Sequence, residues 1–146
     1  MIALVQRVND ASVRVEGKTV ADIGVGALVF IGVEKGDNTD NAIALFNKLR
    51  KFRIFADDTG KMNLNIEQVG GELLLVPQFT LPAETKKGNR PGFDPVADPQ
   101  TGKELFEKLC QLFKEQTELK VETGIFQADM KVRLENDGPL TFWLQK

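Results

Sequence analysis

The sequence contains no histidine and no tyrosine, and it has one cysteine and one serine. Without histidine, the chain lacks the most common general base near neutral pH and the most frequent zinc ligand. Ser-His and Cys-His nucleophile pairs are excluded for the same reason. We therefore expect no dedicated metal site and no cofactor. Ser12 lies in an alternating, strand-like stretch and Cys110 flanks a helical apolar stripe, so both are predicted to be structural.

The sequence also lacks the long apolar run of ~20 residues that a membrane helix needs. It shows no leader-like start, and its single cysteine cannot form an internal disulfide. These absences predict a cytoplasmic protein that does not associate with membranes. The formal net charge of -2 predicts an overall field that repels nucleic acid, so any RNA contact must be local.

The residues present fit one domain. A chain of 146 residues that is 42% hydrophobic can bury a sizeable core, about 68–70% of its unfolded surface. β-Branched and alternating segments predict a hairpin, a central strand covered on both faces, and several shorter strands. The predicted strands span residues 2–8, 12–16, 18–23, 26–34, 53–56, 61–66, 72–81, 119–123, 128–136 and 140–145.

Two segments carry apolar residues at helical spacing. The first lies between Asp37 and Phe52, with basic residues toward its C-terminal end, where the helix dipole favours them. The second follows Thr101, which with Glu104 matches a capping box. The predicted fold class is α/β: largely antiparallel or mixed β-sheets of about eight strands, with two main helices packed on one face. Residues 1–146 form a single compact domain in this prediction.

About twenty residues after Leu81 hold four of the six prolines and show no periodic pattern. A loop of this length in a small domain is usually functional or mobile. Its Lys86, Lys87 and Arg90 form the densest basic cluster of the chain. A solvated loop and a phosphate or RNA contact are both open interpretations, and the second gives our candidate RNA contact.

Two short motifs draw attention without identifying a function by themselves. VPQFTL at 76–81 ends an apolar strand with an amide, an aromatic and a hydroxyl group, just where the long loop begins. NDGP at 136–139 has the composition of a hairpin turn that feeds the last strand, although its proline removes a ladder donor. In that last strand Trp143 has apolar neighbours on both sides. A second subunit could cover the outer face of such a strand.

Together these motifs resemble a known family. VPQFTL, NDGPLT at 136–141, the opening IALVQRV, KMNLN, RPGF at 90–93 and GIFQADMKV at 124–132 are similar to segments of the bacterial D-aminoacyl-tRNA deacylases, in the same order along the whole chain. The family has Ser-Gln-Phe-Thr where this chain has Pro77 before Gln78. Any role of that serine hydroxyl cannot be carried over, and Pro77 also lacks a backbone donor.

The resemblance implies a homodimer with active sites at the subunit interface that hydrolyses the ester of D-aminoacyl-tRNA at its 3′ end. It also implies activity on glycine mischarged on alanine tRNA. Gln78, Phe79 and Thr80 are then the catalytic candidates. Gly138 and Pro139, joined by a cis bond, enter the partner's active site and face the chiral centre. Arg7 matches an arginine that supports this motif across the dimer.

The resemblance implies catalysis assisted by the 2′-hydroxyl of the tRNA, with backbone N–H groups near Phe79 and Thr80 binding the carbonyl oxygen. In the alternative, Thr80 attacks as a nucleophile, which needs a base that QFT does not supply. Two other functions remain open from the residues alone. One is a Thr80-dependent hydrolase of small esters or amides. The other is a non-catalytic dimeric module that binds RNA or protein through the proline-rich loop.

Overall fold

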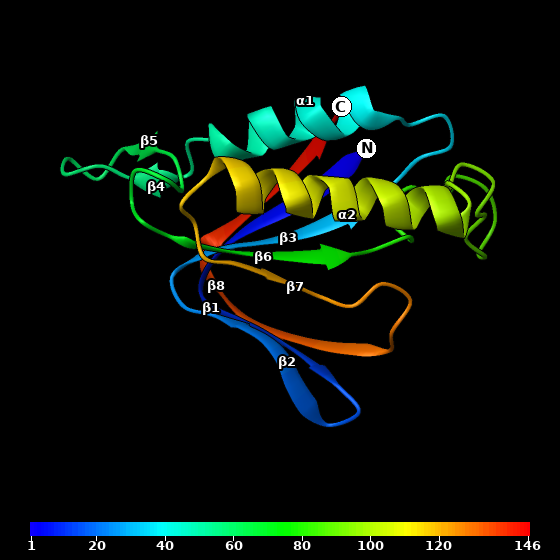
Figure 1. Ribbon diagram of the computed structural model, residues 1–146, viewed down its shortest axis with the longest axis horizontal. Helices are drawn as coiled ribbons and strands as arrows, with labels where there is room; N and C mark the ends of the chain where they lie inside the picture. Colours follow the sequence, from blue (N-terminus) through cyan, green and yellow to red (C-terminus); the bar gives the residue numbers. More distant parts are fainter.

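The computed structural model describes residues 1–146 and contains eight strands and two helices, as predicted. Six strands form one sheet with the pairing order β2-β1-β3-β6-β7, and β4 and β5 form a separate small hairpin (Figure 1). β2 and β3 pair with different parts of one edge of β1, and β8 pairs with its other edge. The strands are β1 Ile2–Val15, β2 Lys18–Ile23, β3 Gly26–Gly32, β4 Phe55–Ala56, β5 Met62–Leu64, β6 Glu72–Pro77, β7 Val121–Thr123 and β8 Met130–Gln145.

The sheet is mixed because the connections differ in length. Tight connections make β1 antiparallel to both β2 and β3. Long crossovers make β3, β6 and β7 parallel, with one helix in each crossover. As a result, β3 and β6 end at the same edge of the sheet. Ligands of open α/β sheets commonly bind at this carboxyl edge.

The two helices, α1 (Thr39–Arg50) and α2 (Pro99–Gln116), begin at well-defined caps. Asn38 accepts a hydrogen bond from the Asp40 N–H and takes part in a capping box that begins α1. The predicted capping box at Thr101 is wrong. Asp98 caps α2 by accepting from the Thr101 N–H, and Pro99 occupies a first-turn position, where its missing N–H costs no bond.

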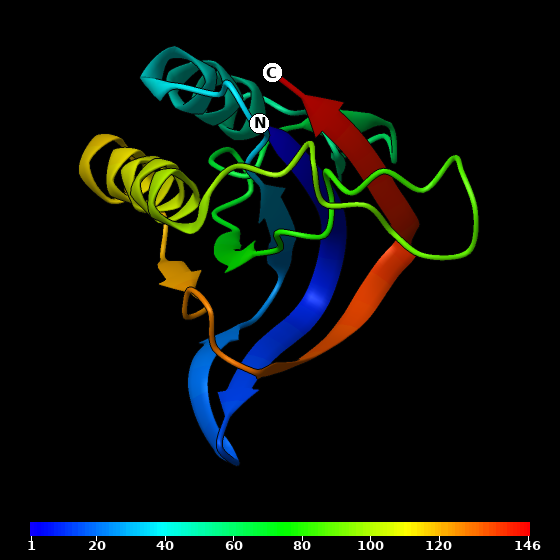
Figure 2. The same cartoon turned by 90° about the vertical axis from the view of Figure 1, so that its right-hand side faces the viewer.

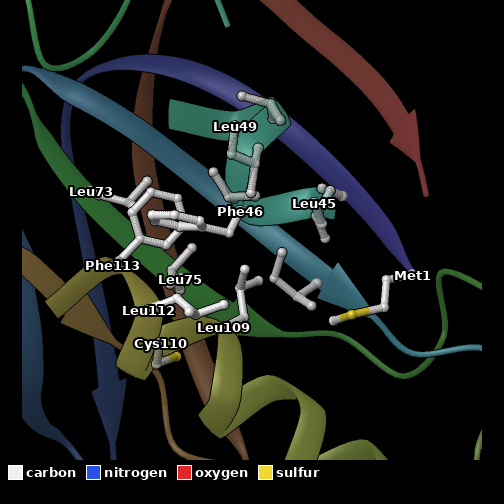
Figure 3. Close-up of a cluster of buried hydrophobic side chains, with 14 of the residues drawn as sticks. Met1, Leu45, Phe46, Leu49, Leu73, Leu75, Leu109, Cys110, Leu112 and Phe113 are labelled. Atoms are coloured by element: carbon white, nitrogen blue, oxygen red, sulfur yellow. The ribbon is translucent and has the colours of Figure 1, made fainter. Parts of the chain in front are cut away.

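Both helices cover the same face of the sheet, as predicted, and the main core lies beneath them (Figures 1 and 3). Phe46 of α1 and Phe113 of α2 meet edge to face, with ring centroids 4.9 Å apart. Leu73 and Leu75 of β6 pack below the rings. Cys110 lies buried in this layer, and its burial raises the thiol pKa to about 12. The prediction that Cys110 serves packing is therefore confirmed.

A smaller core occupies the opposite face, where the sheet curves strongly and β1, β2 and β8 extend away from the helices (Figure 2). It joins Val8 and Val13 of β1 to Ile23 of β2 and Leu28 of β3. The central strand β3 thus contributes alternate side chains to both cores. This confirms that it is covered on both faces.

Several strand boundaries differ from the prediction by a few residues, and three differences change the organisation of the strands. The segments 2–8 and 12–16 form one continuous strand, β1, because β8 pairs with it along nearly its whole length. The NDGP motif is not a hairpin turn, since β8 runs through it from Met130 to Gln145. Strand β6 ends at Pro77, so Gln78 to Leu81 form a turn rather than a strand end.

The last strand does carry apolar residues on both faces. Phe142 and Leu144 pack against the main core, whereas Trp143 is 51% exposed on the other face. None of the helices combines the length and hydropathy that crossing a bilayer requires.

Candidate functional site

A cavity of about 880 Å³ opens at the carboxyl edge of the sheet, where β3 and β6 end. We refer to it as the strand-end cavity. Pro77, Gln78 and Phe79 line it from the end of β6, so the VPQFTL motif lies at its wall. The first turn of α2 and the segment 126–130 line other sides. A pocket of this size can hold a nucleoside or a similar small ligand.

Residues 78–81, here called the β6 turn, project from the end of a buried parallel strand. The Gln78 N–H donates to the Ile31 carbonyl at 2.7 Å, which anchors the first residue to β3. Leu81 N–H closes the turn on the Gln78 carbonyl at 3.3 Å. Within the turn, Gln78 Nε2 donates to the Thr80 hydroxyl oxygen at 2.6 Å. The Thr80 hydroxyl therefore accepts from an amide and has no carboxylate or amine in hydrogen-bond contact to remove its proton.

The backbone N–H groups of Phe79 and Thr80 donate to no acceptor within the protein. They are adjacent in sequence, and both residues are exposed. Free main-chain donors held by a rigid turn are the usual means of binding a developing oxyanion. Both N–H groups are therefore available to a ligand, and their role as oxyanion donors stays a prediction.

Aromatic side chains surround the strand-end cavity. Phe79 and Phe93 approach with ring centroids 5.6 Å apart and remain 59% and 47% exposed, which is unusual for side chains of this size. Phe106 and Phe126 lie deeper, 6.4 Å apart. Exposed rings at a cavity are suited to stacking on a flat ligand such as a nucleobase. Gly102 of α2 lies directly against the Phe126 ring, because an added Cβ would be in van der Waals contact with it at 3.4 Å.

Three polar side chains, Asp98, Gln127 and Asp129, also line the cavity. Hydrogen bonds from Thr101 lower the pKa of the Asp98 carboxyl below its ordinary value, and the Thr101 side chain has a larger effect than its backbone N–H. Asp98 is thus an anion at neutral pH, and it accepts the Thr101 N–H in capping α2. No group of three or more His, Cys, Asp or Glu side chains is arranged to hold a metal ion.

The residues predicted to contact RNA lie on a loop beside the cavity. Glu84 and Gly92 form an isolated antiparallel bridge that closes this segment, which we call the basic loop. Lys86, Lys87 and Arg90 are all exposed on it, and none of the three forms a salt bridge. Phe93 follows directly, so the loop runs from free positive charges to an aromatic residue of the cavity.

The NDGP motif forms a bulge in β8. Asn136 is level with Val8 of β1 and Thr141 with Gln6, so residues 137–140 of β8 lie opposite Arg7 alone. We call these four residues the β8 bulge. Gly138 and Pro139 lie exposed within it, and the bond between them is cis, as the resemblance implies.

Arg7 supports the β8 bulge from β1. Its Nε lies 2.8 Å from the Asp137 carboxylate and also donates to the Asp137 carbonyl at 3.2 Å. Its Nη1 donates to the Ile54 carbonyl at 2.8 Å. The expectation placed this support across a dimer, whereas the contacts seen here join Arg7 to its own chain. Arg7 is more than an ordinary strand residue, because three of its contacts go to the bulge and to residue 54.

The sheet registers keep the β8 bulge far from the β6 turn within one chain. Pro77 at the end of β6 is level with Ala3 in β1 and with Leu144 in β8. Three spacings of ~4.8 Å place Leu144 roughly 14 Å across the sheet, and the residues back to Gly138 add roughly 20 Å along it. The structure thus brings Gln78, Phe79 and Thr80 together, but places Gly138, Pro139 and Arg7 elsewhere on the chain.

Sequence reasoning did not assign Phe93, Phe126 or Gln127 to the site. Phe93 belongs to the RPGF segment, and Phe126 and Gln127 belong to the GIFQADMKV segment; both segments contribute only to the family resemblance. Gln127 has a positive φ of 62°, which is uncommon for a residue other than glycine and often marks a functional segment. No periodic pattern could have placed these residues beside β6, because the loop after Leu81 separates Phe93 from it and the α2 crossover separates Phe126 and Gln127 from it.

Comparison with known proteins gives a consistent result. The family model described as D-Tyr-tRNA(Tyr) deacylase matches residues 4–145. Curated D-aminoacyl-tRNA deacylases from Dichelobacter nodosus and Vibrio parahaemolyticus are 54% and 52% identical, each over 99% of both chains.

Two solved structures share the fold. One, described as a c-Myc DNA Unwinding Element Binding Protein, has a TM-score of 0.95 at 31% identity over 100% of this chain and 99% of its own. Another, a probable eukaryotic D-amino acid tRNA deacylase, has a TM-score of 0.83 at 18% identity over 99% and 98% of the two chains, which supports the fold alone. On the strength of the family match and the close relatives, this chain belongs to the D-Tyr-tRNA(Tyr) deacylase family.

Proposed function

We propose that this chain is a hydrolase that cleaves the ester between a D-amino acid and the terminal ribose of tRNA. The products are the free amino acid and the tRNA. The observation that carries the proposal is the pair of unbonded backbone N–H groups at Phe79 and Thr80 beside an aromatic cavity, in a chain of this family. Such donors match the oxyanion that forms when water attacks an acyl ester. The cavity has room for the terminal nucleoside that carries the ester.

In the proposed mechanism the tRNA helps to activate the water. The vicinal 2′-hydroxyl of the ribose orients the attacking water, which adds to the carbonyl carbon while the Phe79 and Thr80 N–H groups bind the oxyanion. The ester C–O bond then breaks, and the ribose oxygen takes up the proton that the attacking water releases. Thr80 is a poor nucleophile in this arrangement, because its hydroxyl accepts from Gln78 and no general base lies in contact. Gln78 orients that hydroxyl, and Phe79 contributes its N–H and its ring.

Chirality is selected by main chain in this proposal. Gly138 and Pro139 would face the α-carbon of the bound amino acid, with backbone carbonyls accepting from its α-ammonium group and no space left for a side chain on the L side. Exclusion of this kind needs no recognition of a particular D side chain. Achiral glycine passes the same barrier, so glycine mischarged on alanine tRNA is a second substrate in the proposal.

The proposal requires a homodimer. Within one chain, Gly138 is too distant from the β6 turn for both to contact one amino acid, as the strand registers indicate. A second copy can supply the missing β8 bulge. The half-exposed Trp143 on the same strand supports a contact surface there, since a large exposed aromatic residue is typical of protein interfaces.

The basic loop is proposed to contact phosphates near the 3′ end of the tRNA. Lys86, Lys87 and Arg90 are exposed and have no acidic partner, so binding a phosphate breaks no existing ion pair. This local contact is compatible with the net charge of -2, provided that the protein grips mainly the end of the tRNA. Because aminoacyl-tRNA is a substrate of translation, the proposed activity takes place in the cytoplasm.

Deacylation of matched D- and L-aminoacyl-tRNA carrying the same amino acid tests the proposal directly. We expect release of the D-amino acid and protection of the L-ester. Equal cleavage of both would contradict chiral selection, and cleavage of neither would contradict the activity itself.

A second candidate is nucleic-acid binding without turnover, which the name of the relative at 31% identity favours. Tight binding of aminoacyl-tRNA or DNA with no ester cleavage would be its sign. The free N–H groups of the β6 turn have no role in that alternative, so a variant that disturbs this turn should leave binding unchanged.

A further inference from the structure

We propose that Asn136 is a positioning residue for stereochemical selection, because its side-chain amide closes the base of the β8 bulge. The inference rests on the proposed function, in which the main chain at Gly138 and Pro139 rejects L-amino acids. It extends the site to a residue that would not itself touch the substrate.

The amide makes two hydrogen bonds to one residue across the bulge. Asn136 Oδ1 accepts from the Leu140 N–H at 2.7 Å, and Asn136 Nδ2 donates to the Leu140 carbonyl at 3.1 Å. A hydrogen-bonded pair in an antiparallel ladder exchanges the same two bonds between backbone groups. The Asn136 side chain thus acts as a substitute strand partner for Leu140. It holds the two ends of the bulge together while residues 137–139 extend between them.

The bulge is also held by the ion pair with Arg7. Arg7 binds Asp137 by both its carboxylate and its carbonyl, next to Asn136. Leu140 is held only through the Asn136 amide among side-chain contacts. Gly138 and Pro139 lie exposed between these two fixed residues. The position of their backbone is therefore determined from one side by Arg7 and from the other by Asn136.

Rigid placement matters more for rejecting the L-isomer than for accepting the D-isomer. Excluding a side chain by contact requires that the main chain does not yield, whereas a D-residue needs only the open side. Loss of the Asn136 bonds frees Leu140 and lets the bulge move away from an incoming L side chain. We expect the L-ester to be cleaved faster in such a variant, while cleavage of the D-ester changes less.

The chain offers a matched control. Gln6 also carries a side-chain amide, and its Nε2 donates to the Thr141 hydroxyl at 3.1 Å, just outside the bulge. Its bond does not close the bulge, so Gln6→Ala removes an exposed amide from the same neighbourhood without freeing Leu140.

The experiment compares wild type, Asn136→Ala, Asn136→Asp and Gln6→Ala by kcat/KM on D- and L-aminoacyl-tRNA carrying the same amino acid. Asn136→Asp keeps the acceptor for the Leu140 N–H but loses the donor to its carbonyl. We expect the D/L ratio to fall at least tenfold in Asn136→Ala and by a smaller factor in Asn136→Asp, and to stay within twofold in Gln6→Ala. A partly unfolded sample lowers both rates by the same factor, so the ratio reports position rather than stability.

An unchanged ratio in Asn136→Ala, with wild type still cleaving D- and rejecting L-esters, would overturn this inference alone. An equal fall in Gln6→Ala would overturn it as well, because the effect would not depend on closing the bulge. A wild-type protein that does not cleave the D-ester would instead refute the proposed function. If Asn136→Ala does not fold, Asn136→Asp carries the same comparison, since it preserves the size of the side chain and one of its two bonds to Leu140.

Discussion

The β6 turn and the β8 bulge both expose main chain, but they are held in different ways. The β6 turn follows a buried parallel strand, and one backbone bond from Gln78 to Ile31 extends the sheet into it. The β8 bulge interrupts a strand at the edge of the sheet and is fixed by the side chains of Arg7 and Asn136. Backbone that continues a buried strand leaves its N–H groups free for chemistry. Backbone displaced from a ladder needs side chains to fix its position.

The largest expected change in rate tests how much the β6 turn contributes to catalysis. If the turn supplies only oxyanion donors, the substrate must supply the group that activates water. A D-aminoacyl-tRNA whose terminal ribose lacks the 2′-hydroxyl should be cleaved about 10²–10⁴-fold more slowly, the usual contribution of general acid–base assistance. Single-turnover rates with saturating enzyme measure this. Equal rates for the two substrates would mean that a group of the protein, and not the substrate hydroxyl, activates the water.

The second-largest expected effect is a loss of activity when the β8 bulge is displaced. Gly138 has a φ of 148°, and a Cβ there would lie 2.7 Å from both the backbone nitrogen and the Cγ of Leu140. Gly138→Ala must therefore shift the bulge. A displacement on the order of 1 Å can cost about 10² in rate, so we expect kcat/KM on the D-ester to fall by about that factor.

Alanine is strained at this φ, so the melting temperature of this variant should fall as well, and the rates are compared well below it. Gly36, which also has a positive φ and has open space around it, gives a matched control in Gly36→Ala. If Gly138→Ala keeps full activity and selectivity, the bulge has no part in the reaction.

A smaller effect, on substrate binding, is expected from the basic loop. Removing one phosphate interaction with a single strand reduces the slope of log affinity against log salt by about 0.7. Charge reversal at Lys86, Lys87 and Arg90 should therefore raise the apparent KM and flatten its salt dependence, with kcat unchanged. Lys18→Glu, on the β1–β2 hairpin and outside the basic loop, serves as the control. The same slope in the triple variant would remove this loop from the tRNA contact.

The smallest expected effect on the rate distinguishes two roles of the β6 turn, as a source of backbone donors or as the source of a Thr80 nucleophile. Thr80→Ala removes the hydroxyl that Gln78 binds but keeps both backbone N–H groups. We expect activity within about tenfold of wild type, whereas loss of a nucleophile commonly costs far more, about 10⁶ in a serine protease. Burst kinetics and mass spectrometry of the stalled enzyme would reveal an acyl-Thr80 intermediate if the alternative held.

Much of the fold followed from local patterns. The helical stripes around Phe46 and Phe113, the central strand 26–34 and the β1–β2 hairpin were all predictable, because burial selects side chains at the period of each element. The errors lie where tertiary contacts override local signals. Asp98 replaced Thr101 as the α2 cap, and pairing with β1 carried β8 through a sequence that has the composition of a turn.

The candidate site divides in the same way. Composition alone was enough to exclude histidine chemistry, and the order of residues along the chain revealed the motifs at 76–81 and 136–141 that carry the family resemblance. Folding was needed to bring Phe93 and Phe126 to the same cavity as Phe79, and to fix the β8 bulge with Asn136 and Arg7. The reason is physical: a motif depends on neighbours along the chain, whereas a cavity and a cross-strand bond depend on long crossovers and register, which many distant residues set together.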